Sequence, residues 1–232
     1  MIVYGRNVAK EILKKGKKVN KIMINKDFSD KEIISLIEKS KIPCQKVEKN
    51  EFRKFDKFSH QGIILDIEDF AYSTVDEMIN DPNSVVIILD HLEDPHNLGA
   101  IIRTSEAAGI DGIIIPKDRS VDVNSTVMKT SAGALENVKV AKVTNLLNTI
   151  KFLKDNGFWI VGTDMDNSQD YRTINYSGKI GIVIGNEGSG MSKSIHDACD
   201  FIAKIPMYGK INSLNASVAA GIMIYEVIRL KK

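Results

Sequence analysis

Residues 180–192 read IGIVIGNEGSGMS, and this stretch decides how the chain is interpreted. No polar side chain interrupts the run from Ile180 to Ile184, which is typical of a strand buried on both faces of a parallel sheet. The glycines that follow at positions 185, 188 and 190 let a ligand approach the backbone closely. Because parallel α/β sheets bind ligands beyond the carboxyl ends of their strands, the stretch predicts a ligand-binding loop.

This loop differs from the glycine-rich loops that bind phosphates. Its spacing nearly fits the phosphate loop G-x-x-x-x-G-K-S/T, but Met191 stands at the lysine position. The carboxylate of Glu187 would also repel a nucleotide's phosphates. The glycine spacing does not fit G-x-G-x-x-G, which disfavours a nicotinamide-dependent oxidoreductase. We therefore expect a neutral or cationic ligand.

The composition is that of an ordinary soluble protein, with 43% hydrophobic and 27% charged residues in a chain of 232. This length accommodates one large domain or two smaller ones. No apolar run reaches the roughly 18 residues of a membrane-spanning helix, and the N-terminus lacks a signal-peptide core, so we expect a cytoplasmic protein without membrane partners. Cys44 and Cys199 lack metal-ligand spacing and are expected to be free, buried thiols.

Charge is distributed unevenly along the chain. Residues 1–58 hold 16 Lys/Arg and 8 Asp/Glu, whereas residues 59–232 hold 16 and 22. A basic first module followed by an acidic second one suggests that the first binds a polyanion such as RNA. The alternative is that these lysines only solubilise helix faces.

The pattern of elements predicts two α/β domains, over 1–70 and 84–232, joined by an acidic linker over 71–83. In the first domain we expect helices at 7–15 and 30–40 and strands at 21–24, 43–47 and 61–65. In the second we expect strands at 85–89, 112–116, 138–143, 158–163, 179–184 and 201–205, and helices at 97–108, 145–156, 192–198 and 213–230. Alternating strands and helices predict a parallel sheet covered on both faces.

Polar residues follow the expected strand at 85–89. Asn97 is expected to cap the next helix with its side-chain oxygen. Arg103 lies six residues further on, roughly 120° around the helix, among apolar or small neighbours. It is either a buried structural partner or a functional cation. Arginine is rarely buried unless it has a partner or a functional role, which favours a functional cation. His91 and His96 have no matching ligand pattern, so no metal site is predicted.

A second polar segment follows the expected strand at 201–205 and leads into the last helix. Ser213 and Asn215 lie at the expected start of that helix, where Ser213 or Asn212 could serve as the cap. A cap explains one of these polar residues but not all three. The small residues over 216–221 permit close packing against another element.

Three motifs in chain order resemble those of the SpoU family of RNA 2′-O-ribose methyltransferases, in the SPOUT superfamily. They read NLGAIIR over 97–103, IGNEGSGM over 184–191, and IPM over 205–207 with SLNASVA over 213–219. The first module, with Gly5-Arg6-Asn7 and His60-Gln61-Gly62, resembles the ribosomal-protein-like RNA-binding domain of the subgroup that modifies large-subunit rRNA. Asn212 and Ala216 depart from the usual third motif without removing an expected role.

The resemblance implies a trefoil knot in the second domain, a homodimer, and S-adenosyl-L-methionine as methyl donor. It places five residues at the cofactor: Gly185, Ile205, Leu214, Met207 and Thr163. It places five others in a polar catalytic set: Asn97, Arg103, Glu187, Ser213 and Asn215. The implied partner is RNA and not DNA.

The resemblance also implies a reaction: methylation of a ribose 2′-hydroxyl, with a guanosine of 23S rRNA as the expected substrate. The family's arginine at the position of Arg103 is proposed as the base. A guanidinium stays protonated in proteins, however, so Arg103 could instead hold a phosphate or stabilise the developing alkoxide. The alternatives are a tRNA ribose methyltransferase and a ribosome-assembly factor that binds RNA without catalysis.

Overall fold

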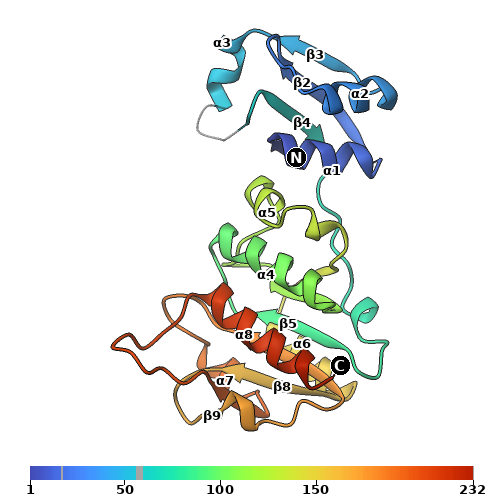
Figure 1. Ribbon diagram of the computed structural model, residues 1–232. Helices are drawn as coiled ribbons and strands as arrows, with labels where there is room; N and C mark the ends of the chain where they lie inside the picture. The colour runs from blue at the N-terminus through green and yellow to red at the C-terminus, as the bar shows by residue number, and fades with distance from the viewer. Residues whose placement is uncertain (17, 56–59, 232) are drawn as a thin grey trace. The chain divides into compact units, whose positions relative to one another are not determined.

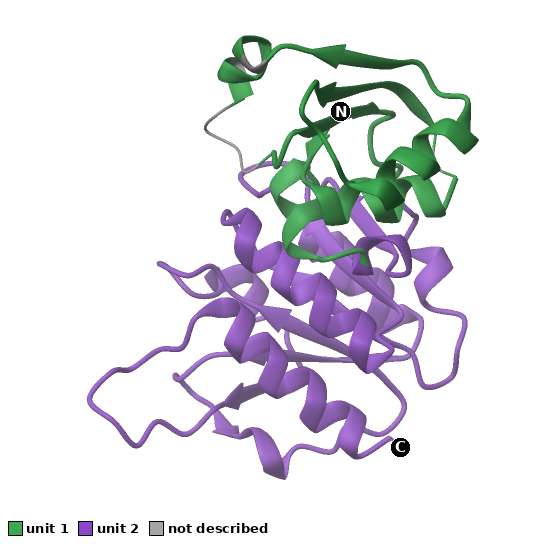
Figure 2. Cartoon of the chain, turned by 45° about the horizontal axis from the view of Figure 1, so that its top comes forward, with its two compact units in different colours: residues 1–71, 123–133 green, residues 72–122, 134–232 purple. Residues whose placement is uncertain are grey.

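The computed structural model describes residues 1–16, 18–55 and 60–231 and divides the chain into two compact units (Figure 2). One unit comprises residues 1–71 and 123–133, and the other comprises residues 72–122 and 134–232. The segment 123–133, which contains helix α5 (Ser125–Thr130), was expected within a continuous second domain. It groups with the first unit because α5 packs against β1 (Ile2–Tyr4) and α1 (Arg6–Lys14).

The first unit contains a four-stranded sheet in the order β1-β4-β2-β3. Strand β4 pairs antiparallel with β1 and β2, and β2 pairs in parallel with β3. The remaining elements of the sheet and its helices are β2 (Val19–Asn25), β3 (Cys44–Val47), β4 (Ile63–Ile67), α2 (Lys31–Ser40) and α3 (Lys49–Phe52). Cys44, expected to be buried, is exposed because it lies on the edge strand β3.

The second unit contains a seven-stranded sheet, of which β5, β8 and β9 are labelled in Figure 1. The strand order is β7-β6-β5-β10-β8-β11-β9, and every neighbouring pair is parallel. Its strands are β5 (Val85–Leu89), β6 (Gly112–Pro116), β7 (Val140–Val143), β8 (Phe158–Thr163), β9 (Gln169–Asp170), β10 (Lys179–Ile184) and β11 (Phe201–Lys204). The predicted α/β fold with a parallel sheet is confirmed. The apolar runs of β5, β6 and β10 are buried because helices cover both faces.

The helices of the second unit are α4 (Pro95–Ala108), α6 (Leu146–Asp155), α7 (Lys193–His196) and α8 (Ala216–Arg229). Two predicted caps are wrong. Asp94 caps α4, with its side chain accepting from the His96 N–H at 3.0 Å, because Pro95 starts the helix two residues before Asn97. Asn215, rather than Asn212 or Ser213, caps α8.

Residues of the expected linker 71–83 pack into the second unit. A short 3-10 helix spans Asp76–Met78, and Met78 is 1% exposed within the core beneath the sheet. Its sulfur fills the space beside Gly112, where a Cβ would lie 2.2 Å away. None of the helices in the described parts of the chain is both long and apolar enough to cross a bilayer.

The two cysteines should differ in reactivity. Burial raises the pKa of the Cys199 thiol to about 12, aided by the neighbouring carboxylate of Asp200. We expect a disulfide reagent at pH 8 to modify the exposed Cys44 first, although partial burial raises its pKa too. Cys199 should react only on unfolding, because the thiolate is the reactive form. Thiol titration of a Cys44→Ser variant, with and without denaturant, measures this; fast modification in the native state would contradict it.

Candidate active site

A cavity of about 290 Å³ opens beyond the carboxyl ends of β8, β10 and β11. One wall is the glycine loop after β10, and another is the segment that leads from β11 into α8. All five residues expected at the cofactor line this cavity: Thr163, Gly185, Ile205, Met207 and Leu214. The sheet order brings them together, because β10 and β11 are the two neighbours of β8.

The glycine loop is closed on itself by backbone hydrogen bonds. Asn186 N–H donates to the carbonyl of Gly190 at 2.9 Å, and Gly190 N–H donates back at 3.0 Å. A Cβ on Gly185 would lie 2.5 Å from the carbonyl carbon of Gly190 and 2.6 Å from the nitrogen of Met191. These neighbours are backbone atoms, so only glycine fits at position 185.

Three of the polar residues form a hydrogen-bonded chain that joins three elements. Asn97 on α4 donates from Nδ2 to Glu187 Oε1 at 2.7 Å. The other side-chain atom of Asn97, Oδ1, accepts from Asn215 Nδ2 at 2.9 Å. Asn215 in turn caps α8 by accepting from the backbone of Ser217 at 2.9 Å. Asn97 is only 6% exposed, and both ends of its amide are satisfied.

The other two predicted catalytic residues are not part of this hydrogen-bonded chain. Ser213 is exposed and lines the cavity beside Leu214. Arg103 does not line the cavity. It is exposed rather than embedded among apolar side chains, because the helix turns Ile101 and Ile102 into the core and Arg103 to the surface. Within the described residues no hydrogen bond or ion pair joins Arg103 to another group.

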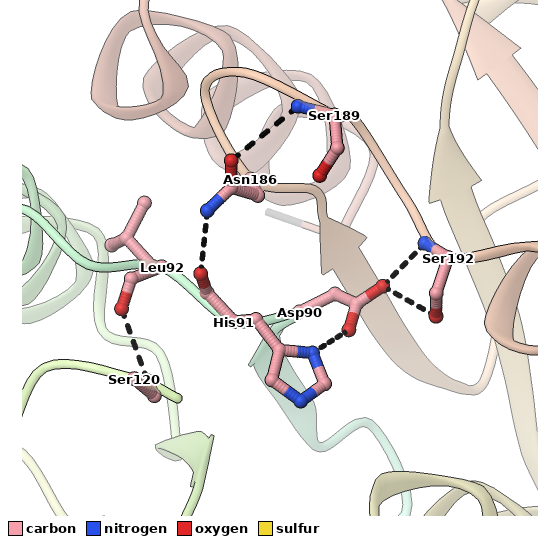
Figure 3. Close-up of polar contacts among 7 residues, drawn as sticks. All are labelled: Asp90, His91, Leu92, Ser120, Asn186, Ser189 and Ser192. Carbon is pink, nitrogen blue, oxygen red and sulfur yellow. Dashed lines mark hydrogen bonds and ion pairs between the residues drawn. The ribbon is translucent and has the colours of Figure 1, made fainter. Parts of the chain in front are cut away.

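Sequence reasoning missed a buried aspartate beneath the loop (Figure 3). Asp90, directly after β5, is 1% exposed. Its Oδ2 accepts from Ser192 N–H at 2.7 Å and from Ser192 Oγ at 2.9 Å, and its Oδ1 lies 2.6 Å from His91 Nδ1. The signal available in the sequence was an acidic residue immediately after a run of five buried apolar ones.

It also missed Asp164, which lies at the end of β8 and lines the cavity. Its Oδ1 accepts from the backbone N–H of Met165 at 2.6 Å and of Asp166 at 3.3 Å. The described residues that line the cavity include the two carboxylates of Asp164 and Glu187 and no lysine or arginine. The cavity therefore favours positive charge.

Family models match most of the chain. Residues 84–225 match the SpoU rRNA Methylase family, and residues 2–73 match the model described as RNA 2′-O ribose methyltransferase substrate binding. The chain belongs to the SpoU rRNA methylase family. It is thus an RNA methyltransferase by family, with a substrate-binding module at its N-terminus.

Named relatives agree with this assignment. A Staphylococcus saprophyticus protein whose name places it in the TrmH family of tRNA/rRNA methyltransferases is 47% identical, covering 99% of this chain and 95% of the relative. The solved structure of an AdoMet-bound rRNA methyltransferase from Sinorhizobium meliloti is 26% identical, with a TM-score of 0.83, covering 98% of this chain and 86% of the other. The TrmH/SpoU tRNA modifying enzyme of A. aeolicus is 30% identical, with a TM-score of 0.58 over 66% of this chain and 78% of its own.

Substitution of Gly185 by alanine should disrupt the cavity, because the new Cβ meets backbone that cannot move aside cheaply. We expect the affinity for S-adenosylmethionine to fall about tenfold or more, since overpacking costs about 1–3 kcal/mol. The matched control is Gly209→Ala, whose Cβ would meet no atom within 4 Å. Isothermal titration calorimetry of both variants measures this; equal affinities would contradict the requirement for glycine.

Proposed function

We propose that this protein transfers a methyl group from S-adenosyl-L-methionine to the 2′-hydroxyl of a ribose in RNA, with a guanosine of 23S rRNA as its substrate. The observation that carries the proposal is the cavity walled by the glycine loop, from which Glu187 is hydrogen-bonded to Asn97 on α4 and, through Asn97, to Asn215 at the start of α8. A binding module without catalysis would have no need to hold a buried amide between a carboxylate and a helix cap.

The cavity fits this cofactor by its charge and by its walls. S-adenosylmethionine carries a sulfonium cation and no phosphate, which suits a cavity whose described lining residues include two carboxylates and no basic side chain. Ile205, Met207 and Leu214 offer apolar surface, and the glycine loop offers close approach to backbone groups. When bound there, the cofactor supplies the methyl group.

The protein's own residues position the ribose and manage its proton. Glu187 holds Asn97 through Oε1, and its other oxygen, Oε2, can accept a hydrogen bond from the ribose hydroxyl. We assign Ser213 and Asn215 to orienting roles, because Ser213 lines the cavity and Asn215 fixes Asn97. Positioning of this kind can supply much of the acceleration of a transfer reaction.

Arg103 acts in this proposal as a cation rather than as a base. Its guanidinium stays protonated, and its exposed position leaves it free to meet RNA. It can hold a phosphate next to the reacting ribose or stabilise the developing alkoxide. Either role requires the positive charge at position 103.

The basic module and exposed apolar side chains support the expected partners. Residues 1–58 carry twice as many basic as acidic residues, and the sequence over 2–73 matches a substrate-binding model. On the second unit, Tyr208, Ile211, Val218 and Tyr225 are 90%, 68%, 50% and 54% exposed. Apolar side chains gathered on one helix and the segment before it are typical of an interface, which favours a homodimer.

The test is transfer of tritiated methyl groups from S-adenosylmethionine to RNA from a strain lacking this protein, followed by mapping of the 2′-O-methyl sites. We expect label in 23S rRNA at a guanosine. Label in tRNA alone would favour the alternative substrate, which the tRNA/rRNA names of relatives keep open. Binding of RNA without any label would support the non-catalytic alternative.

Substitution of Arg103 by alanine should abolish most activity without harming the fold, because the side chain is exposed and makes no hydrogen bond or ion pair with another described residue. We expect kcat to fall about 10²- to 10³-fold, the usual effect of removing a group that stabilises developing charge. Cofactor affinity should stay unchanged. Arg229→Ala, which removes an arginine paired with Glu226 at the end of α8, is the control. Near-normal methylation by the Arg103 variant would contradict its proposed role.

Substitution of Asp164 by asparagine should weaken the cofactor more than its product. S-adenosylhomocysteine lacks the sulfonium charge, so the lost carboxylate affects it less. We expect the affinity for S-adenosylmethionine to fall about tenfold, because one charge interaction near the sulfonium is lost. The affinity for S-adenosylhomocysteine should fall much less. Asp166→Asn, outside the cavity lining, is the control. Calorimetry with both ligands decides; an equal loss for both would contradict a charge effect.

A further inference from the structure

The turn after β5 lies directly against the glycine loop. Strands β5 and β10 pair in parallel, with Leu89 opposite Ile184, and Asp90 N–H donates to the carbonyl of Ile184 at 2.8 Å. This bond from residue 90 continues the backbone hydrogen bonding of the two strands one residue beyond Leu89. The loop begins one residue further along, at Gly185.

Asp90 holds the far end of this loop. Both hydrogen bonds from Ser192, through its backbone N–H and its hydroxyl, go to Asp90 Oδ2 (Figure 3). Ser192 occupies the cap position of α7, yet its side chain makes no capping bond to that helix, because the hydroxyl is bonded to Asp90 instead. A buried carboxylate requires such donors, since burial of an unpaired charge is costly.

The residue next to Asp90 holds the near end. His91 has φ 58°, and its carbonyl accepts from Asn186 Nδ2 at 2.7 Å. The oxygen of the same amide, Asn186 Oδ1, accepts from Gly188 N–H at 2.8 Å. The His91 ring is itself fixed by Asp90 Oδ1 at 2.6 Å. A positive φ at a residue other than glycine is uncommon, and here the surrounding bonds maintain it.

Glu187 therefore lies between Asn186, which is bonded to the carbonyl of His91, and Gly188, which is bonded to the side chain of Asn186. Its partner Asn97 belongs to α4, which begins five residues after Asp90 on the same chain segment. One buried carboxylate thus fixes both the loop that carries Glu187 and the start of the segment that carries Asn97.

From this geometry we propose that Asp90 is a positioning residue for methyl transfer: through Ser192 and His91 it holds the glycine loop so that Glu187 meets Asn97 at the ribose. The inference rests on the proposed function and deepens it. Asp90 is 1% exposed and is not among the described residues that line the cavity, so its effect must pass through Glu187.

The test is a double-mutant cycle between positions 90 and 187, with kcat measured at saturating S-adenosylmethionine and RNA. We expect Asp90→Ala to lower kcat about 10²-fold, which is the loss that a misplacement of reacting groups by about 1 Å can cause. In a Glu187→Gln background, Asp90→Ala should lower kcat little further, because the group that it positions has already lost its function. Equal losses in the two backgrounds would overturn the proposal.

A conservative variant separates positioning from charge. In Asp90→Asn, the amide oxygen can still accept both bonds from Ser192, and the amide N–H can meet the unprotonated Nδ1 of His91. We expect this variant to keep kcat within about threefold of wild type, because a threefold change corresponds to less free energy than one typical hydrogen bond contributes. A loss as large as that of Asp90→Ala would overturn the geometric role.

Two further measurements keep the outcome clear. Asp200→Ala is the control, because that half-buried carboxylate also accepts from a backbone N–H, that of Ile160, and pairs with Lys154 away from the loop. It should lower Tm and leave kcat unchanged; a matching loss of kcat would reduce Asp90 to a stability role.

If Asp90→Ala does not fold, Ser192→Ala replaces it in the same double-mutant cycle, with an expected loss of kcat of about fivefold. Wild-type protein without methyl transfer would refute the proposed function, whereas active wild type with an additive cycle would refute only the role of Asp90.

Discussion

Strands β5 and β10 pair in parallel along the whole of β5, from Val85 opposite Ile180 to Leu89 opposite Ile184. Because parallel strands end at the same edge, whatever follows either strand must share that edge. The residues after β5 are Asp90, His91 and the start of α4, and those after β10 are the glycine loop. The cavity, the polar chain and the buried aspartate all depend on this pairing, although the two strands are about 90 residues apart in sequence.

Polar side chains at this edge are hydrogen-bonded to one another. Asp90 is almost fully buried and accepts three bonds, while Asn97 donates to Glu187 and accepts from Asn215. Hydrogen bonds to charged groups contribute about 1.5–3 kcal/mol each, and removal of one partner from a buried charge costs more than the bond itself. Such a network rigidifies the loop, which suits a site that works by positioning.

Much of the fold could be predicted from apolar patterns. The strands at 85–89, 112–116, 158–163 and 179–184 have the predicted bounds, because strands of a parallel sheet covered by helices are nearly continuous apolar runs. Short elements such as β1, β9 and α5 carry too few residues to show a period and were missed. The knot implied by the family resemblance stays a prediction.

The candidate site was predictable in part. The motifs contain Gly185, Ile205, Met207 and Leu214, which line the cavity, whereas Thr163, also expected there, lies outside them; the family assignment agrees with the motifs. Cap positions were wrong at Asn97 and Ser213 because several polar residues near each helix start could cap it equally well by sequence alone. Pro95 and the hydrogen bond between Asn97 and Asn215 determine which residues cap the two helices. That hydrogen bond joins residues 118 positions apart in sequence.

By itself the sequence determined the parallel α/β class, the methyltransferase family and the loop at 185–192, because these depend on local pattern and on residue types at fixed spacing. Only the tertiary structure decided that Asp90 lies beneath that loop, that Asp164 joins the cavity wall and that Arg103 faces outward. Each of these follows from strand order and helix rotation in three dimensions. A single sequence carries no record of which strand ends are neighbours, and so cannot show which carboxylate a distant loop will meet.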